Sequence, residues 1–290
     1  MIKPWIEAMR LRTLPVSVAG VITAWAFAIL SGHMRWVPAV LCMVFAVLAQ
    51  IASNFANEYY DYRDGLDRPG REGPRRGVTE GDITPQAMKA ATFITLALAC
   101  CVGLSLVIWG GWWLVAAGVL IALGALAYSA GPWPLSRHGL GEVAVVVFFG
   151  LVPVNLTFYL ATGELWNELV GLASVSIGLM GANVLIINNY RDREEDAAVG
   201  KRTLAVIAGP KLMSWLYLLN GYMAVALLLT VWLWLGPWSW IVACGYIILH
   251  TIVYHWMTLL HGRALNPLLG MTAMLMAAFS VGLLLCAIFL

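Results

Sequence analysis

The chain has 290 residues, of which 61% are hydrophobic and 11% are charged, and its formal net charge is +2. Because a soluble globular domain carries about 25% charged residues, this composition excludes an ordinary soluble protein and indicates a polytopic membrane protein. The small net charge and the localised basic residues give no indication of nucleic-acid binding. The five cysteines all lie in apolar runs, so we expect neither a metal-binding cysteine cluster nor a disulfide framework.

Nine apolar runs are each long enough to cross a bilayer, because a helix needs about 20 apolar residues to span the hydrocarbon core. They predict an all-α fold, a polytopic bundle of nine transmembrane helices that forms one domain over residues 1–290. The runs are 14–32, 36–57, 87–109, 112–131, 140–162, 167–189, 212–235, 238–260 and 266–289.

The basic residues predict how these helices are oriented, because cytoplasmic loops are enriched in Lys and Arg. With the N-terminus in the cytoplasm, 16 of the 17 Lys and Arg residues fall on the cytoplasmic side, and only Arg35 falls on the other. We therefore expect the N-terminus inside, the C-terminus outside and both strongly charged loops in the cytoplasm. No removable signal peptide is evident.

The stretch 54–82 contains four Asp, three Glu and five Arg in an otherwise apolar chain. Asn57 and Asp61 are four residues apart, so they project from one face of a helix. Asp64 and Asp67 follow on either side of the expected helix end. Carboxylates followed at once by arginines can hold divalent cations, and the cations and arginines together can hold a polyanion such as a diphosphate. The alternative is a solvated, charge-balanced loop.

A second acidic stripe at the end of the run 167–189 repeats this pattern. Asn188, Asp192 and Asp196 recur at intervals of four and therefore lie on one helical face. Both stripes begin with Asn-x-Tyr-x-Asp, at Asn57 and Asn188, and both are followed by a Gly and a basic pair ahead of a Thr. Because both end even-numbered helices, the two helices run parallel. Facing each other, the stripes would make one site with two carboxylate-rich walls.

Such walls at a membrane surface suit the ionisation of an allylic diphosphate. The acids would repel one another without a cation between them, and Mg²⁺ commonly bridges protein carboxylates to substrate phosphates. Mg²⁺ and the arginines would neutralise the departing group, and electrostatic stabilisation of this kind usually supplies a large share of catalysis. The prenyl tail could lie between helices while the charged head stays at the cytoplasmic face.

These residues resemble motifs of the UbiA superfamily of membrane prenyltransferases. Asn57, Asp61 and Asp67 resemble its first acidic motif, and Asp192-x-x-x-Asp196 resembles its second. Within the superfamily the chain most resembles the branch that prenylates 1,4-dihydroxy-2-naphthoate. The segments that carry this closer match are Arg10 to Pro15, Asp61 to Asp67, Gly73 to Gly77, Tyr128 to Pro134, Gly139 to Glu142, Asn188 to Asp192 and Gly200 to Leu204.

The resemblance implies a reaction as well as a fold of nine helices. A polyprenyl diphosphate would ionise, the naphthoate ring would attack the allylic carbon, and the ring carboxylate would leave as CO₂, which gives demethylmenaquinone. The implied partners are polyprenyl diphosphate, 1,4-dihydroxy-2-naphthoate, Mg²⁺ and membrane lipid, with no obligate protein partner. The implied location is the plasma (inner) membrane, with the active site at its cytoplasmic face.

The resemblance also implies roles for individual residues. Mg²⁺ would be held by the catalytic acids and one amide: Asn57, Asp61, Asp67, Asp192 and Asp196. The diphosphate would be bound by Arg71, Arg75, Arg76, Arg137, Asn188, Lys201 and Arg202, of which Arg75 or Arg76 are the stronger candidates. The aromatic acceptor would be oriented or deprotonated by Asp64, Tyr128 or Glu142, and the sequence does not choose among these three.

Two other functions stay open at this point. A prenyltransferase for 4-hydroxybenzoate or homogentisate would use the same diphosphate apparatus and differ only at the acceptor. A cation transporter would use the acids as an ion path and would place charged residues deep inside its helices. The acids here lie mostly at cytoplasmic helix ends beside arginines, which favours an anionic head group.

Overall fold

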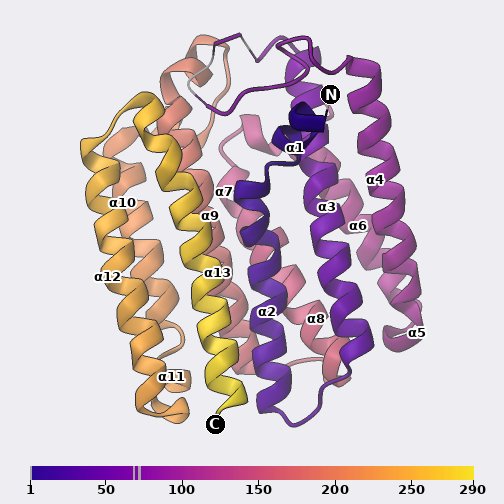
Figure 1. Cartoon of the computed structure of the whole chain (residues 1–290), viewed down its shortest axis with the longest axis vertical. Helices are drawn as coiled ribbons and strands as arrows, with labels where there is room; N and C mark the ends of the chain where they lie inside the picture. Colours follow the sequence, from indigo (N-terminus) through magenta and orange to yellow (C-terminus); the bar gives the residue numbers. More distant parts are fainter. Residues whose placement is uncertain (1, 68, 71–72) are drawn as a thin grey trace.

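In a computed structural model the described residues, 2–67, 69–70 and 73–290, form helices joined by loops, with no β-strand among them. The long helices run roughly side by side and make a single bundle (Figure 1). The N- and C-termini lie at opposite ends of this bundle.

The helices match the apolar runs of the sequence in order and position. The first half of the chain contains α1 (Ile2–Met9), η1 (Leu11–Thr13), α2 (Leu14–Leu30), α3 (Trp36–Arg63), α4 (Pro85–Ser105), α5 (Val107–Gly110), α6 (Trp113–Ser129) and η2 (Leu135–Arg137). The second half contains α7 (Gly141–Val145), the π-helical η3 (Val146–Leu151), α8 (Val152–Thr162), α9 (Glu168–Ala198), α10 (Leu204–Ala226), α11 (Leu229–Leu235), α12 (Pro237–Leu259), η4 (Gly262–Leu265) and α13 (Asn266–Ile288).

Seven helical stretches in the described part of the chain are long and apolar enough to cross a membrane. The pair α10–α11, bent by 44°, makes an eighth if it counts as one span. Helix α6 is apolar but only 17 residues long. The predicted all-helical membrane bundle is therefore confirmed, while length and composition by themselves identify seven or eight spans rather than nine.

Local capping signals set where several helices begin. The Thr84 side chain accepts a hydrogen bond from the Ala87 amide at the start of α4, and Asn167 caps α9 in the same way. Helix α10 begins at Leu204, eight residues before the predicted run at 212. Gly209 interrupts α10 with a φ of 77°. The apolar run recognisable in the sequence therefore begins only after this kink.

The helices α3 and α9 extend beyond their predicted apolar runs. Helix α3 continues past 57 to Arg63, and α9 continues past 189 to Ala198. Both acidic stripes are consequently parts of continuous helices. Helix α3 ends where the sequence predicts, because Gly65 adopts a φ of 69°, a left-handed conformation that favours glycine.

Helix α9 lies at the centre of the bundle, with 72% of its apolar window buried. It packs closely on η3, because small residues let backbones approach in membrane bundles. A Cβ atom added to Gly150 of η3 would lie 2.3 Å from the Ser174 carbonyl oxygen and 2.5 Å from the Gly178 Cα. This close approach fixes the distance between η3 and the helix that carries the second acidic stripe.

Replacing Gly150 with Ala should therefore destabilise the bundle. Overpacking of a tight contact typically costs about 1–3 kcal/mol, because the two backbones would have to move apart. We expect a lower melting temperature, measured from intrinsic tryptophan fluorescence of the purified protein in detergent. Gly245→Ala is the matched control, since a methyl group there would meet no atom within 4 Å. Equal melting temperatures for the two variants would contradict the prediction.

Candidate functional site

A cavity of about 610 Å³ extends from one end of the bundle deep into its interior. Its lining on α3 runs from Asp61 to Cys42, a distance of about 28 Å at 1.5 Å per residue. The lining is polar around Asn57 and Asp61 and apolar around Phe45 and Cys42. The cavity therefore has a charged end and a long apolar arm.

The apolar arm reaches the outer surface of the bundle between α4 and α6. Leu104 of α4 and Val119 and Leu123 of α6 line the cavity and are also exposed. Exposed apolar side chains on a membrane bundle face lipid. An apolar chain can therefore enter from the side while its polar head stays at the charged end.

Both acidic stripes line the charged end of this cavity. Asn57 and Asp61 come from α3, and Asn188, Asp192 and Asp196 come from α9. Asp61 and Asp192 are each only 2% exposed. The structure thus brings the two stripes together around one cavity, although they are more than 100 residues apart in the chain.

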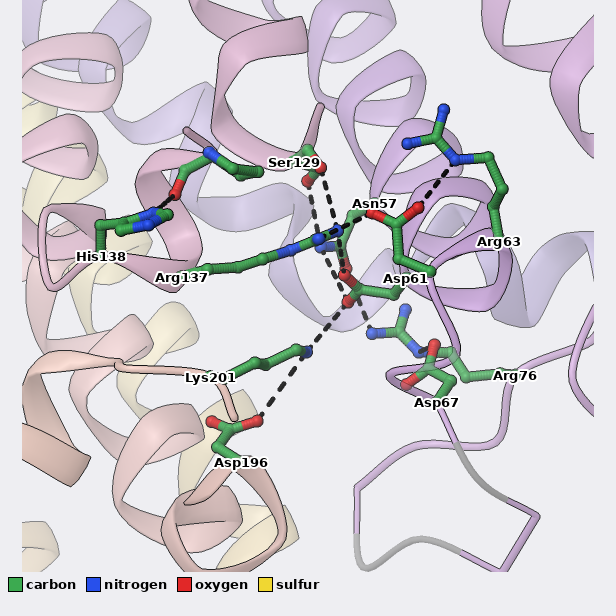
Figure 2. A network of polar contacts seen from close by, with 12 residues as sticks. Asn57, Asp61, Arg63, Asp67, Arg76, Ser129, Arg137, His138, Asp196 and Lys201 are labelled. Atoms are coloured by element: carbon green, nitrogen blue, oxygen red, sulfur yellow. Dashed lines mark hydrogen bonds and ion pairs between the residues drawn. The ribbon is translucent and has the colours of Figure 1, made fainter. Parts of the chain in front are cut away.

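Asp61 shares its buried carboxylate among three partners (Figure 2). Its Oδ1 lies 3.4 Å from Arg137 Nη2, and its Oδ2 lies 3.2 Å from Lys201 Nζ and 3.3 Å from Asn57 Nδ2. Lys201 also lies 3.8 Å from the Asp196 Oδ1. Because a buried carboxylate is costly unless it is paired, Lys201 stabilises both acidic stripes and links α3 to the end of α9.

Asn57 sits at the centre of a second set of contacts. It donates to the Ser129 hydroxyl at 3.1 Å and accepts from Arg76 Nη2 at 3.1 Å and from Arg10. Arg76 also lies 3.4 Å from the Asp67 Oδ2. Arg76 therefore ties the loop after α3 to the first acidic stripe.

Arg10 is a site residue that sequence reasoning did not assign. Among the described residues it is the one non-glycine with a positive φ, 53°, at the break between α1 and η1. A left-handed non-glycine residue costs about 1–3 kcal/mol, so the surrounding structure must favour this conformation. Its guanidinium lines the cavity and donates to Asn57. The visible signal was a basic residue between apolar neighbours, but backbone strain cannot be read from a sequence.

Arg191 is the second unassigned residue, and it fixes the second stripe. Its guanidinium contacts both Asp192 carboxylate oxygens, at 2.6 and 2.8 Å. It also donates to Asn188 Oδ1 and to Asn266 Oδ1 of α13, both at 2.8 Å. Because such two-pronged pairs are strong and directional, Arg191 orients Asp192 and Asn188 towards the cavity.

The predicted diphosphate-binding residues divide into two groups. Arg76, Lys201 and Asn188 line the cavity, and Arg137 reaches Asp61 from η2. Four of the seven therefore lie at the charged end.

The other predicted diphosphate residues lie elsewhere. Arg75 pairs with Asp82, lies 3.7 Å from Glu7 Oε2 and does not line the cavity. Arg202 is exposed and does not line it either. Arg71 falls outside the described residues.

Of the acceptor candidates, Asp64 does not line the cavity. Its carboxylate accepts from Arg63 Nε at 2.8 Å and from Arg137 Nη1 at 2.7 Å. Burial by itself would raise the pKa of Asp64, but the hydrogen bonds from Arg63 and Arg137 outweigh it and lower the pKa below its ordinary value. Asp64 is thus a carboxylate held by two arginines, and it is poorly suited to accept a proton.

Of the other two acceptor candidates, Tyr128 lines the cavity and Glu142 lies behind its wall. Tyr128, in the last turn of α6, lines the cavity. Glu142 of α7 is 8% exposed and does not line it. Glu142 Oε1 accepts a hydrogen bond from Asn189 Nδ2 at 2.9 Å, and Asn189 does line the cavity.

The donor atoms of the two stripes suit Mg²⁺. Carboxylate and amide oxygens are hard ligands of the kind Mg²⁺ prefers. In the described part of the chain no group of three His, Cys, Asp or Glu side chains is placed to hold a metal by itself. Mg²⁺ usually keeps several waters and takes one or two carboxylates together with substrate phosphates. The residues therefore fit a Mg²⁺ site that a bound diphosphate completes.

The sequence is similar to proteins with named activities. A model of the UbiA prenyltransferase family matches residues 19–275. The 1,4-dihydroxy-2-naphthoate octaprenyltransferase of Escherichia coli (strain K12) is 39% identical over 213 residues, which are 71% of this chain and 68% of that protein. The protein of the same name from Mycobacterium tuberculosis is 39% identical over 236 residues, which are 81% of this chain and 79% of that protein.

The fold is also similar to a solved structure. A UbiA homolog from Archaeoglobus fulgidus, bound to DMAPP and Mg²⁺, superposes with a TM-score of 0.62 over 94% of this chain and 98% of that chain. The two sequences are 17% identical. The likeness therefore shows a shared fold.

Replacing Arg191 with Met should destabilise the protein strongly. It would remove the guanidinium that contacts both carboxylate oxygens of the buried Asp192, and breaking a buried pair on one side costs about 3–5 kcal/mol. We expect a large drop in melting temperature, measured by intrinsic fluorescence, and partial recovery in the double variant Arg191→Met/Asp192→Asn.

Arg193→Met is the matched control for this variant. Arg193 lies on the same helix and, within the described part of the chain, pairs with Glu194, whose side chain is 88% exposed. Surface pairs of this kind contribute about 0–1 kcal/mol, so the control should melt close to the wild type. If the control melts at as low a temperature as Arg191→Met, Arg191 has no special role in the stability of the protein.

Proposed function

Because the chain belongs to the UbiA prenyltransferase family, we propose that it transfers a polyprenyl group from polyprenyl diphosphate to 1,4-dihydroxy-2-naphthoate. Diphosphate and CO₂ are released, and the direct product is the quinol form of demethylmenaquinone, on the route of menaquinone biosynthesis. The observation that carries the proposal is the single cavity with both acidic stripes at one end and a lipid-facing apolar arm at the other. The choice of acceptor is supported by the names of the relatives that are 39% identical.

The proposal includes an arrangement in the plasma membrane. The whole chain acts as one domain that crosses the bilayer nine times, with the N-terminus and the active site at the cytoplasmic face. The position of the termini at opposite ends of the bundle supports an odd number of crossings (Figure 1). Helix α6 would be the ninth, since its 17 residues measure about 26 Å, close to the thickness of the hydrocarbon core.

The charged end of the cavity binds the diphosphate and its metal. Asn57, Asp61, Asp192 and Asp196 would hold Mg²⁺, which when bound supplies positive charge to the departing diphosphate. Asp67 would add a further carboxylate to this metal site from the loop after α3, where it pairs with Arg76.

Cationic side chains prepare the same end of the cavity for a polyanion. Arg10, Arg76 and Lys201 line it and would neutralise the phosphate oxygens. Lys201 pairs with Asp61 and Asp196, and Arg76 pairs with Asp67. Binding of a diphosphate draws these cations towards phosphate oxygens, so the site exchanges internal ion pairs for pairs with the substrate.

The apolar arm guides the prenyl chain and protects the reaction from water. When the bond between the allylic carbon and the diphosphate oxygen breaks, the carbon bears positive charge until the ring carbon attacks it. The new carbon–carbon bond forms, and the ring carboxylate leaves as CO₂ with its electron pair retained by the ring. A lining of residues such as Phe148, Phe149 and Leu185 keeps water from this carbon.

The proposed reaction can be tested with purified protein in detergent. Farnesyl or geranylgeranyl diphosphate and Mg²⁺ are supplied with 1,4-dihydroxy-2-naphthoate, 4-hydroxybenzoate or homogentisate, and product masses are measured. We expect a prenylated naphthoate product that has lost CO₂, and no product after EDTA is added. Prenylation of another acceptor alone would move the protein to a different branch of the family. No product with any acceptor would contradict the proposal as a whole.

Arg75 and Arg76 provide a matched pair for the diphosphate site. Arg76→Met removes a cavity-lining cation and should reduce kcat/KM for prenyl diphosphate by about tenfold to a hundredfold, because hydrogen bonds to charged groups contribute about 1.5–3 kcal/mol. Arg75→Met affects an ion pair outside the cavity and should stay within about twofold of the wild type. The difference is measured from initial rates at varied concentrations of prenyl diphosphate. Equal melting temperatures of the two variants show that a loss of rate is not a loss of folding. A larger loss for Arg75→Met would reverse the assignment.

A further inference from the structure

Asn189 and Glu142 form a buried polar pair that the diphosphate chemistry does not use. Asn189 is 7% exposed and Glu142 is 8% exposed. The Glu142 Oε1 accepts from Asn189 Nδ2 at 2.9 Å, and the Glu142 Oε2 has no hydrogen-bond partner in the described part of the chain. Buried polar groups normally have hydrogen-bond partners. A buried carboxylate oxygen without one, beside a ligand cavity, therefore suggests that the pair has a function.

The contact with Glu142 determines which end of the Asn189 amide faces a ligand. An amide side chain offers donors at nitrogen and an acceptor at oxygen. Because Nδ2 of Asn189 is directed to Glu142, its carbonyl oxygen is the acceptor that the cavity receives. Glu142 thereby fixes the orientation of an amide that could otherwise turn over.

Tyr128 belongs to the same section of the cavity wall. A Cβ atom added to Gly141, the neighbour of Glu142, would lie 3.7 Å from the Tyr128 hydroxyl oxygen and 3.0 Å from a methyl carbon of Leu185. Tyr128, Leu185 and Asn189 all line the cavity. An aromatic ring, an aliphatic side chain and one amide therefore share a wall next to the charged end, which suits a flat aromatic ligand with a hydroxyl group.

We infer that the Asn189 carbonyl oxygen accepts a hydrogen bond from a ring hydroxyl of the aromatic acceptor, and that Glu142 is the positioning residue for this contact. The inference rests on the proposed function, because it assigns a subsite for the acceptor of that reaction. The ligand class is a hydroxyarene carboxylate. No covalent bond to the protein forms, and the hydroxyl proton stays on the acceptor oxygen while it is hydrogen-bonded to Asn189 Oδ1.

Charge explains why a neutral amide stands between Glu142 and the acceptor. The acceptor carries its own carboxylate, and a second carboxylate in direct contact would repel it. Glu142 does not line the cavity, so it holds Asn189 without presenting its own oxygens to the ligand. The amide oxygen attracts the hydroxyl proton and increases electron density on the ring, and it leaves the carboxylate of the acceptor undisturbed.

A pair of ligands that differ by one hydroxyl tests the contact. We would measure equilibrium binding of 1-hydroxy-2-naphthoate and 2-naphthoate to the full-length protein in detergent by calorimetry. The wild type should bind the hydroxylated ligand roughly tenfold more tightly, because a site built to pair with a hydroxyl discriminates against its absence. Asn189→Leu should remove this advantage while leaving the affinity for a non-hydrolysable prenyl diphosphate analogue within about twofold.

The control is Asn155→Leu, which changes an asparagine of α8 that donates to the Leu151 carbonyl at the end of η3 and does not line the cavity. It should keep the full hydroxyl advantage. Glu142→Gln should reduce the advantage, since a glutamine can pair with either end of the Asn189 amide.

Two results would overturn the inference: a wild type that binds both naphthoates equally, or an Asn189→Leu variant that keeps the hydroxyl advantage. Wild-type turnover with 1,4-dihydroxy-2-naphthoate is measured separately and reports on the proposed reaction alone. A protein that turns over the naphthoate but fails the hydroxyl comparison keeps its proposed function and loses only this subsite.

Discussion

The buried carboxylate of Asp61 is the constraint on which the charged end of the bundle depends. A carboxylate that is 2% exposed is unfavourable unless cations approach it. Its cationic partners are Arg137 of η2, which follows α6, and Lys201 of the loop after α9. Charge compensation of one side chain therefore brings together three segments that are distant in the chain, and the gap between α3 and α9 that results is the charged end of the cavity.

The two acidic stripes look alike in sequence but are neutralised differently. Asp61 is paired with side chains that belong to other segments and can turn towards a polyanion. Asp192 is held on both oxygens by Arg191 of its own helix, whose position is further fixed by Asn266. The first wall is consequently adaptable and the second is preorganised. A site of this kind can accept a charged substrate without rebuilding both of its walls.

The sequence predicts those parts of the site that helical periodicity controls. Spacings of four placed Asn57 with Asp61, and Asn188 with Asp192 and Asp196, on single helical faces, and the structure has them on α3 and α9. Loops follow no such rule: Arg75 and Arg76 are chemically equal neighbours, yet one faces Asp82 and the other Asn57. The left-handed backbone of Arg10 and the buried fork of Arg191 depend on tertiary packing, so a single sequence could not reveal them. Length and hydropathy predicted nine spans, whereas the described helices give seven or eight by the same criteria, because α6 is short and the α10–α11 pair is bent.

The opening of the apolar arm between α4 and α6 determines the phase from which the protein draws its prenyl substrate. A molecule that enters sideways comes from the bilayer and not from bulk water, and its prenyl group returns to the bilayer as part of a lipid quinol. Occupancy of the cavity is then set by the mole fraction of prenyl diphosphate among the surrounding lipids. Adding inert lipid or detergent dilutes the prenyl diphosphate within this two-dimensional pool. The prenyl diphosphate concentration at half-saturation, expressed per volume of solution, therefore shifts with the amount of lipid or detergent present. The water-soluble naphthoate obeys ordinary bulk concentration, and the two substrates of one reaction follow different concentration scales.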